Sequence, residues 1–598
     1  MFKRKETLLI ILISIVLVIL TACNEEVTEE VKDYGFEYKD VTEKTGIEFT
    51  HKKPQFDNKV DNVMPWLSST GAGVFLNDYN NDGYVDVYLV NSKKGTSNYL
   101  YKNNGDGTFT DVTKDSGIGL VNEEGISETA LWFDYNNDGY QDLFVGAWGK
   151  SQLFKNNGDG TFENVSAEAG VNPEGYAVKA IALDYNRDGF LDLYIGNYFR
   201  DETNLWDLKS TKIFHNDFEK ARNGGENILY KNNGDGTFSD VTKEMGVEDP
   251  GWTLAAGSAD LNKDGWPDIY NANDFGPDSL YLNQEGKGFQ KIVQKRGIGD
   301  DTFKGMNVDF GDVFHDGNLA NYVSNISKEK YLLEGNQLWH MDESGKFVEK
   351  AEDLGVKQAG WSWGARFFDV NNSGNMSLVV TNGFISGKKD EDYWFEMGTL
   401  ATTPGDVVQD AKNWPAIGEK SMSGYEPKAL FLYQDGKFTN VAQDVGIDFV
   451  YDGRGVAVAD FDNNGTLDLI FANQGAPLKV YSNEQTNQNN WIKIDLNGVF
   501  PSNREAVGTR LTFTNNGVET VIEKDGGNSF GAQSDPRVHL GLEKSTVLDK
   551  LEIQWPSGKE QVFEDINANQ IISITEGNNN YEILQKGTAF KGSEVDNE

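Results

Sequence analysis

The sequence predicts an all-β fold, in which a seven-bladed β-propeller over residues 36–484 is followed by a small β-domain over residues 489–577. Three observations lead to this prediction. An acidic motif, D-x-[DN]-x-[DN]-G-x-x-D, recurs along the chain. A stretch such as DVYLVN follows each copy and alternates in the manner of a strand. A hairpin such as NYLYKNNGDGTFTDVT comes next, with the Asn, Asp and Gly residues that tight turns need.

The spacing of the motif fits propeller blades. Full copies begin at Asp78, Asp134, Asp184, Asp260 and Asp460, and two degenerate copies begin at Asp312 and Asp369. The start-to-start spacings are 56, 50, 76, 52, 57 and 91 residues. A period of about 50 residues with two insertions is typical of propellers.

The two ends of the repeat array predict how the ring closes. Residues 36–47 match the end of a repeat, whereas the last repeat stops at residues 480–484 without such a segment. We therefore expect the N-terminal strand to complete the last blade, which leaves only short and protected sheet edges.

The acidic motifs predict calcium-binding loops. Positions 1, 3, 5 and 9 offer side-chain oxygens, position 7 offers a backbone carbonyl, and the glycine at position 6 permits a sharp turn, a donor set that suits Ca²⁺. None of these positions holds His or Cys, which disfavours zinc and copper. Position 12 is not the Glu of an EF-hand but a residue of a predicted strand: Leu89, Val145, Ile195, Asn271 or Phe471. The loops thus resemble the calcium-binding hairpin loops of integrin-α-type propellers.

About five calcium sites are predicted. Their donors are Asp78, Asn80, Asp82, Tyr84 and Asp86; Asp134, Asn136, Asp138, Tyr140 and Asp142; Asp184, Asn186, Asp188, Phe190 and Asp192; Asp260, Asn262, Asp264, Trp266 and Asp268; and Asp460, Asp462, Asn464, Thr466 and Asp468.

Two copies of the motif have fewer oxygen donors. The loop at Asp312 has Phe314 at position 3 and Ala320 at position 9 and is predicted to be empty, and the loop at Asp369 keeps one carboxylate and is predicted to bind weakly at best. The alternative for all the loops is an Asx-rich turn that binds nothing, although such a turn does not need a carboxylate at position 9.

Composition narrows the function classes. The chain has 54 Lys and Arg against 94 Asp and Glu, a net charge of −40, which excludes nucleic acid as a partner. Five calcium ions would bring that charge only to about −30, so we expect chelation to destabilise the fold by mass action. A single Cys rules out an intramolecular disulfide.

The N-terminus has the pattern of an export signal. Three basic residues at positions 3–5 precede an apolar run from Leu8 to Leu20, which is shorter than the roughly 20 residues of a membrane-spanning helix. The tetrapeptide LTAC, ending at Cys23, resembles a bacterial lipobox. We expect a lipoprotein signal peptide over residues 1–22, lipid on Cys23 and a tether over residues 23–35. The protein would be anchored to the outer face of the cell membrane, or be periplasmic or at the outer membrane in a two-membrane envelope. An ordinary export signal is the alternative, and residues 578–598 read as a polar tail.

Three segments near the C-terminus carry a family resemblance: NREAVGTR from Asn503, GNSFGAQSDPRVHLGL from Gly527 and WPSGKEQ from Trp555. Together with FG-GAP/VCBS-type repeats, they resemble the ASPIC/UnbV (cartilage acidic protein 1-like) family. The resemblance implies a calcium-binding propeller with an appended β-domain, without a settled activity. Leu540 stands where the family has Phe, and Phe384 stands where it often has His.

No catalytic constellation is evident. The five histidines are scattered over different repeats, and Ser534, Asp535 and His539 lie within six positions without a nucleophile elbow. We expect structural roles for these three residues. The run WSWGARFFD from Trp361 fits core packing better than a sugar-stacking platform.

Two insertions, residues 198–227 and 383–428, mix aromatic with charged residues, as a protein or glycan contact surface would; packed loops covering the propeller are the equal alternative. The leading hypothesis is a calcium-binding, lipid-anchored surface protein that is a non-catalytic binding or adhesion module for a protein or glycan partner. Catalysis stays open, because residues converging from several blades leave no linear motif. The alternatives are an exported enzyme with an active site in the propeller channel, acting on polysaccharide or a specialised metabolite, and an envelope assembly scaffold.

Overall fold

The computed structural model describes residues 32–292, 297–299, 301–328 and 332–586. The chain divides into two units, residues 1–34 and 35–598, and the second contains everything discussed below. The predicted signal peptide, Cys23 and most of the tether lie outside the described residues, as does the tail from residue 587. None of the helices in the described ranges is long and apolar enough to span a membrane.

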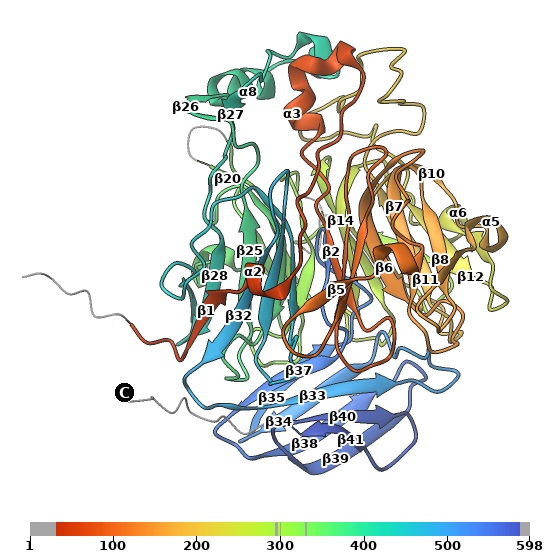
Figure 1. Ribbon diagram of the computed structural model, residues 1–598, viewed down its shortest axis with the longest axis vertical. Helices are drawn as coiled ribbons and strands as arrows, with labels where there is room; N and C mark the ends of the chain where they lie inside the picture. Colours follow the sequence, from red (N-terminus) through yellow and green to blue (C-terminus); the bar gives the residue numbers. More distant parts are fainter. Residues whose placement is uncertain (1–31, 293–296, 300, 329–331, 587–598) are drawn as a thin grey trace, which may run out of the picture. The chain divides into compact units, whose positions relative to one another are not determined.

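Groups of four antiparallel strands follow one another along the chain, each built from one predicted repeat except the last, which the N-terminal strand completes (Figure 1). Strand pairing joins the second and third groups into one eight-stranded sheet, and a fifth strand extends the first group, so the prediction of seven separate blades is not confirmed. Seven such groups can be followed in the described residues. They are β2 (Val74–Asn77), β3 (Asp86–Leu89), β4 (Tyr99–Asn103) and β5 (Phe109–Asp111); β6 (Ile126–Phe133), β7 (Asp142–Lys150), β8 (Gln152–Asn156) and β9 (Phe162–Asn164); β10 (Glu174–Leu183), β11 (Asp192–Asn197), β12 (Ile228–Asn232) and β13 (Phe238–Asp240); β14 (Trp252–Ala259), β15 (Asp268–Phe275), β16 (Ser279–Asn283) and β17 (Phe289–Ile292); β18 (Asp309–Gly311), β19 (Ala320–Val323), β22 (Gln337–Met341) and β23 (Phe347–Glu349); β24 (Ser362–Phe368), β25 (Ser377–Asn382), β28 (Ala429–Gln434) and β29 (Lys437–Asn440); and β30 (Gly453–Ala459), β31 (Asp468–Asn473), β32 (Lys479–Gln485) and β1 (Phe36–Asp40).

The last sheet is completed by the N-terminal strand, as predicted. β1 pairs antiparallel with β32, with Phe36 opposite Gln485 and Asp40 opposite Tyr481. β30 of this sheet also contacts β2, the first strand of the first sheet, so the two ends of the array are neighbours. The first strand of each sheet, here called the inner strand, is almost entirely buried, and the WSWGARFFD run forms such a strand, β24. The prediction that this run packs in the core is confirmed.

Short helices follow the outer strands of five sheets. They share a Thr-, Ser- or Ala-led turn that ends at a glycine with a left-handed backbone, such as Gly117 at φ 84°, a conformation that costs glycine least. These helices are α2 (Thr42–Thr45), α4 (Thr113–Ser116), α5 (Ser166–Ala169), α6 (Thr242–Met245) and α7 (Ala351–Leu354).

Three segments gather at one end of the ring and form what we call the cap: residues 51–71, 198–227 and 383–428 (Figure 1). The two insertions pack on each other, with the rings of Phe214 and Trp414 stacked 4.2 Å apart. The first segment, which sequence reasoning did not single out, joins them through Asn62, whose Nδ2 donates to the carbonyl of Trp414. Short elements in and beside the cap are η1 (Asn58–Val63), α3 (Met64–Leu67), β26 (Lys388–Asp392), α8 (Trp394–Ala401), α9 (Gly405–Val408), η2 (Ala411–Asn413), β27 (Lys420–Ser421), and the pair β20 (Ser327–Lys328) and β21 (Leu332–Leu333).

The C-terminal domain lies at the opposite end of the ring from the cap (Figure 1). Two four-stranded sheets enclose its own apolar core, which includes Ile494, Phe513 and Leu551. The sheets are β37 (Val538–Glu543), β33 (Asn490–Asn497), β40 (Gln570–Thr575) and β41 (Glu582–Lys586), and β35 (Val518–Glu523), β34 (Arg510–Asn515), β38 (Val547–Gln554) and β39 (Glu560–Asn567). The prediction of an all-β, propeller-type fold followed by a small β-domain is confirmed. One short strand, β36 (Ala532–Gln533), leaves this domain and pairs in parallel with β2.

Candidate functional site

The predicted calcium loops connect the first and second strands of their sheets, and their backbones are built alike. Position 4 has a left-handed backbone in every copy, degenerate ones included, with φ between 53° and 59°. In the first loop the position-1 carboxylate of Asp78 accepts the amides of Asp82 and Gly83, at 3.0 and 2.7 Å. Asp86 at position 9 begins the next strand and accepts the amides of Tyr79 and Asn103. These amide contacts hold both carboxylates in place within the loop.

The loop carboxylates are buried close to like charges. Burial and the charges of Asp78 and Asp82 raise the pKa of Asp86 to about 8. Burial and the charges of Asp134 and Asp138 raise the pKa of Asp142 to about 9, and its Oδ2 is buried without a hydrogen-bond partner. Such carboxylates are stabilised by a divalent cation, and an oxygen-only donor set fits Ca²⁺. Among the described residues, no three His, Cys, Asp or Glu side chains form a group that could hold a metal ion, so the predicted sites depend on asparagine and backbone oxygens as well.

Asparagines outside the predicted donor sets tie neighbouring loops together. At position 4, Asn81 donates to the carbonyl of Gly139 in the next loop, and Asn463 of the last loop donates to Gly83 of the first. The first Asn of the hairpin turn reaches the preceding loop: Asn103 donates to the carbonyl of Phe461 at 2.8 Å. Equivalent hairpin contacts come from Asn156, Asn232, Asn283 and Asn483. Sequence reasoning missed these residues, although their fixed place in the repeat was a visible signal.

The C-terminal domain covers the acidic loops. Its contacts include the Glu523 carboxylate, which accepts the amide of Asp260, and the Arg537 guanidinium, which donates to the carbonyl of Gly83. The domain also contacts position-1 carboxylates directly. Arg504 contacts Asp134, the Val521 amide donates to Asp312, the Gly541 amide donates to Asp369, and Lys493 donates to Asp460.

Residues 526–533, which we call the channel segment, run from the C-terminal domain in among the inner strands. The carbonyl of Gly526 accepts the amide of Ala182 on β10, and the carbonyl of Gly531 accepts the amide of Val74 beside β36. The amide of Phe530 donates to Oδ1 of Asn307 at 2.7 Å. Further contacts reach β6, β10, β14 and β24 through Gln533, Gly527, Asn528 and Ser529. The GNSFG part of the family motif therefore fills the propeller channel from one end.

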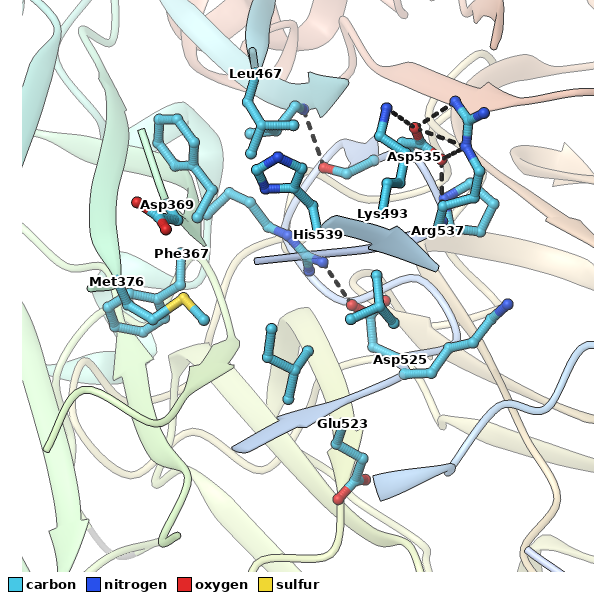
Figure 2. Close-up of a pocket in the computed structure, with 18 of the residues that line it drawn as sticks. Phe367, Asp369, Met376, Leu467, Lys493, Glu523, Asp525, Asp535, Arg537 and His539 are labelled. Carbon is cyan, nitrogen blue, oxygen red and sulfur yellow. Dashed lines mark hydrogen bonds and ion pairs between the residues drawn. The ribbon is translucent and has the colours of Figure 1, made fainter. Parts of the chain in front are cut away.

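A cavity of about 120 Å³ lies where the C-terminal domain meets the loops (Figure 2). Ser534, Asp535 and His539 all line it, but they are not linked as a catalytic triad. Ser534 Oγ accepts the amide of Val458, and Asp535 is bound by the guanidinium of Arg537 at 2.7 Å. Burial lowers the pKa of His539 to about 4, and its Nε2 faces the carbonyl of Gly465.

A larger cavity, of about 320 Å³, lies between the loops at Asp78 and Asp134 and the C-terminal domain. Arg504 and Glu505 of the NREAVGTR segment line it together with both position-1 carboxylates. The Arg504 side chain is about half exposed, so this cavity opens to solvent.

The cap covers the other end of the channel. Arg454 on β30 is fully buried there and donates to the carbonyls of Ser69, Gly383 and Phe384. Its guanidinium also lies 4.1 Å from the centre of the Trp363 ring. Phe384, at the position where the family often has His, is buried and stacks 4.0 Å from Trp361.

Comparisons with known proteins agree with this architecture. Residues 498–581 match the family model described as ASPIC and UnbV, and residues 78–133, 134–195, 221–271 and 260–320 match the FG-GAP-like repeat. Cartilage acidic protein 1 of Xenopus tropicalis is 26% identical over 344 residues, which cover 56% of this chain and 38% of the relative. The human protein of that name is 24% identical over 362 residues, covering 59% and 40%. The chain thus spans about two fifths of the length of these curated relatives.

Solved structures give weaker likenesses. An Agrocybe aegerita lectin that recognises terminal N-acetylglucosamine is 17% identical with a TM-score of 0.37, covering 62% of this chain and 80% of the lectin. The lectin BP39L of Burkholderia pseudomallei is 9% identical with a TM-score of 0.40, covering 70% and 97%. We draw no functional conclusion from likenesses at these TM-scores. The sequence resemblance to ASPIC/UnbV proteins with FG-GAP repeats is confirmed by the two family models.

Proposed function

We propose that this chain, an ASPIC/UnbV protein with FG-GAP-like repeats, is a calcium-binding, lipid-anchored surface protein that acts as a non-catalytic binding or adhesion module for a protein or glycan partner. The supporting observation is that its channel is occupied at both ends. The channel segment fills one end and the buried core of the cap covers the other. A partner would therefore meet the outer surfaces of the scaffold.

The outer side of the cap offers a suitable contact surface. Residues 388–392, the strand β26, are charged and exposed throughout. Phe395 on the adjacent helix α8 is 84% exposed, and Lys389 lies over the ring of Tyr425, which is 36% exposed. Exposed aromatic and charged groups on loops carried by a rigid scaffold are the residue types that protein and glycan contacts use.

Calcium would be held by the acidic loops, where it would neutralise carboxylates that are otherwise buried beside one another. The test is thermal unfolding of the chain from residue 24 onward in calcium, in excess EDTA, and with calcium restored. We expect a reversible fall in melting temperature on chelation. Protein that is free of calcium by elemental analysis would refute this part of the proposal.

The partner surface is tested by binding to glycan and protein arrays in calcium buffer. Phe395→Ala should weaken binding to any ligand found, whereas Phe500→Ala, which removes another largely exposed ring from the C-terminal domain, should leave it unchanged. Equal loss in both variants, or turnover of a polysaccharide by the purified protein, would contradict the proposal. Lipid anchoring is tested separately, because Cys23→Ala should move the protein from the membrane fraction to the soluble fraction.

A further inference from the structure

The acidic loop at Asp460 differs from the other full loops in its surroundings. It carries three carboxylates, as the loop at Asp78 does, and the sequence predicts a calcium site in both. In the structure, Lys493 on β33 of the C-terminal domain reaches into this loop. Its Nζ lies 2.6 Å from Oδ2 of Asp460, and the two side chains are 1% and 0% exposed.

Lys493 is fixed in this position. β33 lies inside its sheet, hydrogen-bonded to β37 on one side and β40 on the other. The ammonium is also 3.7 Å from Asp535, which Arg537 holds in turn. Withdrawing Lys493 would therefore require the C-terminal domain to leave the loop.

The first acidic loop shows the contrasting case. Lys102 lies 3.1 Å from Asp82 at position 5, but its side chain is 39% exposed and stands on the hairpin of the same blade. Such a lysine can turn into solvent when a calcium ion arrives, at little cost. Lys493 has no such freedom.

In the two loops predicted to be empty or weak, the C-terminal domain contacts the same carboxylate oxygen. The position-1 Oδ2 accepts the Val521 amide in the loop at Asp312 and the Gly541 amide in the loop at Asp369, both at 3.0 Å. Lys493 meets the corresponding Oδ2 of Asp460. In three consecutive repeats, then, this oxygen is an attachment point for the C-terminal domain.

We propose that the Lys493 ammonium takes the place of a metal ion at the Asp460 loop, so that the chain binds four calcium ions, in the loops at Asp78, Asp134, Asp184 and Asp260. This inference rests on the proposed calcium binding. A fixed positive charge in contact with a ligand carboxylate repels a divalent cation strongly where water is excluded. Lys493 of the C-terminal domain thereby neutralises part of the negative charge of the Asp460 loop. The same ion pair holds the domain on the last blade.

The experiment counts calcium bound to the full chain by isothermal titration calorimetry and elemental analysis. We expect four ions in the wild type. Asp78→Asn should lower the count to three, whereas Asp460→Asn should leave it at four. Lys493→Met, which keeps an unbranched side chain one atom shorter and removes its charge, should raise the count to five, with the affinity of the Asp460 loop increased at least about tenfold.

The outcomes separate the two proposals. Five ions in the wild type, or a count that stays at four in Lys493→Met, would overturn the role of Lys493 and leave calcium binding intact. A wild type that binds no calcium would overturn the proposed function, and this inference with it. If either Asp460→Asn or Lys493→Met fails to fold, the wild-type count together with Asp78→Asn still decides between four ions and five.

Discussion

Replacing Phe530 by Ala tests whether the channel segment holds the propeller and the C-terminal domain together. The Phe530 ring is 2% exposed and lies 5.4 Å from the ring of Trp363. Its surroundings have little freedom to close the resulting hole, because a Cβ on Gly364 would already stand 2.9 Å from the carbonyl oxygen of Phe530. Large-to-small changes of a buried Phe cost about 3–5 kcal/mol, and a rigid site favours the upper half of that range.

The assay is urea unfolding of the full chain, followed by tryptophan fluorescence and by far-UV circular dichroism. Since the segment contacts inner strands of several sheets, we expect both probes to report one transition that moves to lower urea. The control is Phe500→Ala, which removes a ring that is 71% exposed and should cost less than about 0.5 kcal/mol. A loss below about 1 kcal/mol for Phe530→Ala, or a separate C-terminal transition with an unchanged propeller midpoint, would refute the reasoning.

Three further predictions concern the ring and its interior. Asn103→Ala removes the buried amide that joins the first and last blades and should lower the free energy of unfolding in urea by about 2–3 kcal/mol. Asn104 is exposed, so Asn104→Ala is a control with a much smaller expected loss. Equal losses in the two variants would count against the interblade contact. Gly455→Ala places a Cβ 2.0 Å from the carbonyl oxygen of Gly531 and should lower stability by at least about 1–3 kcal/mol. The control is Gly398→Ala in α8, whose Cβ would meet nothing within 4 Å and which should be neutral or stabilising. A Gly455→Ala variant as stable as the wild type would show that the channel segment is not tightly packed. Burial raises the pKa of Glu128 to about 8, so the folded state retains a proton that the unfolded state releases near its ordinary pKa, and stability should fall as pH rises between the two values. Glu128→Gln should remove that part of the pH dependence, on the order of a few kcal/mol at pH 9, and identical melting curves against pH for variant and wild type would contradict it.

The blades could be predicted because their signals are local. An acidic turn, an alternating strand and an Asn-Gly hairpin recur within each repeat, and the unfinished last repeat indicated the shared sheet formed by β1 and β32. The donor positions of the loops were also readable, since all lie within nine residues. Local patterns of this kind do not depend on which other part of the chain packs against them.

The channel segment could not be predicted on the same basis. Residues 526–533 are rich in glycine and polar side chains, the composition of a surface turn, and their partners lie hundreds of residues away on the inner strands. Lys493 presents the same difficulty, because its place in an alternating strand is that of an ordinary polar residue. Lys493 lies beside Asp460 only because the C-terminal domain packs against the acidic loops. The insertions were ambiguous for another reason, since aromatic residues are equally suited to a buried core and to a contact surface.

The acidic loops and the cap differ in what they leave exposed. Every position-9 carboxylate of the full loops is buried, and the C-terminal domain contacts the position-1 carboxylates of Asp134, Asp312, Asp369 and Asp460 from outside. Any ion in these loops therefore lies at an interface within the chain, where its charge acts first on the packing of the blades and of the C-terminal domain. The cap has the reverse organisation, because its aromatic core closes the channel while β26 and Phe395 face solvent. Mutations in the loops should thus appear first as changes in stability, and mutations on the outer side of the cap as changes in binding with the fold intact.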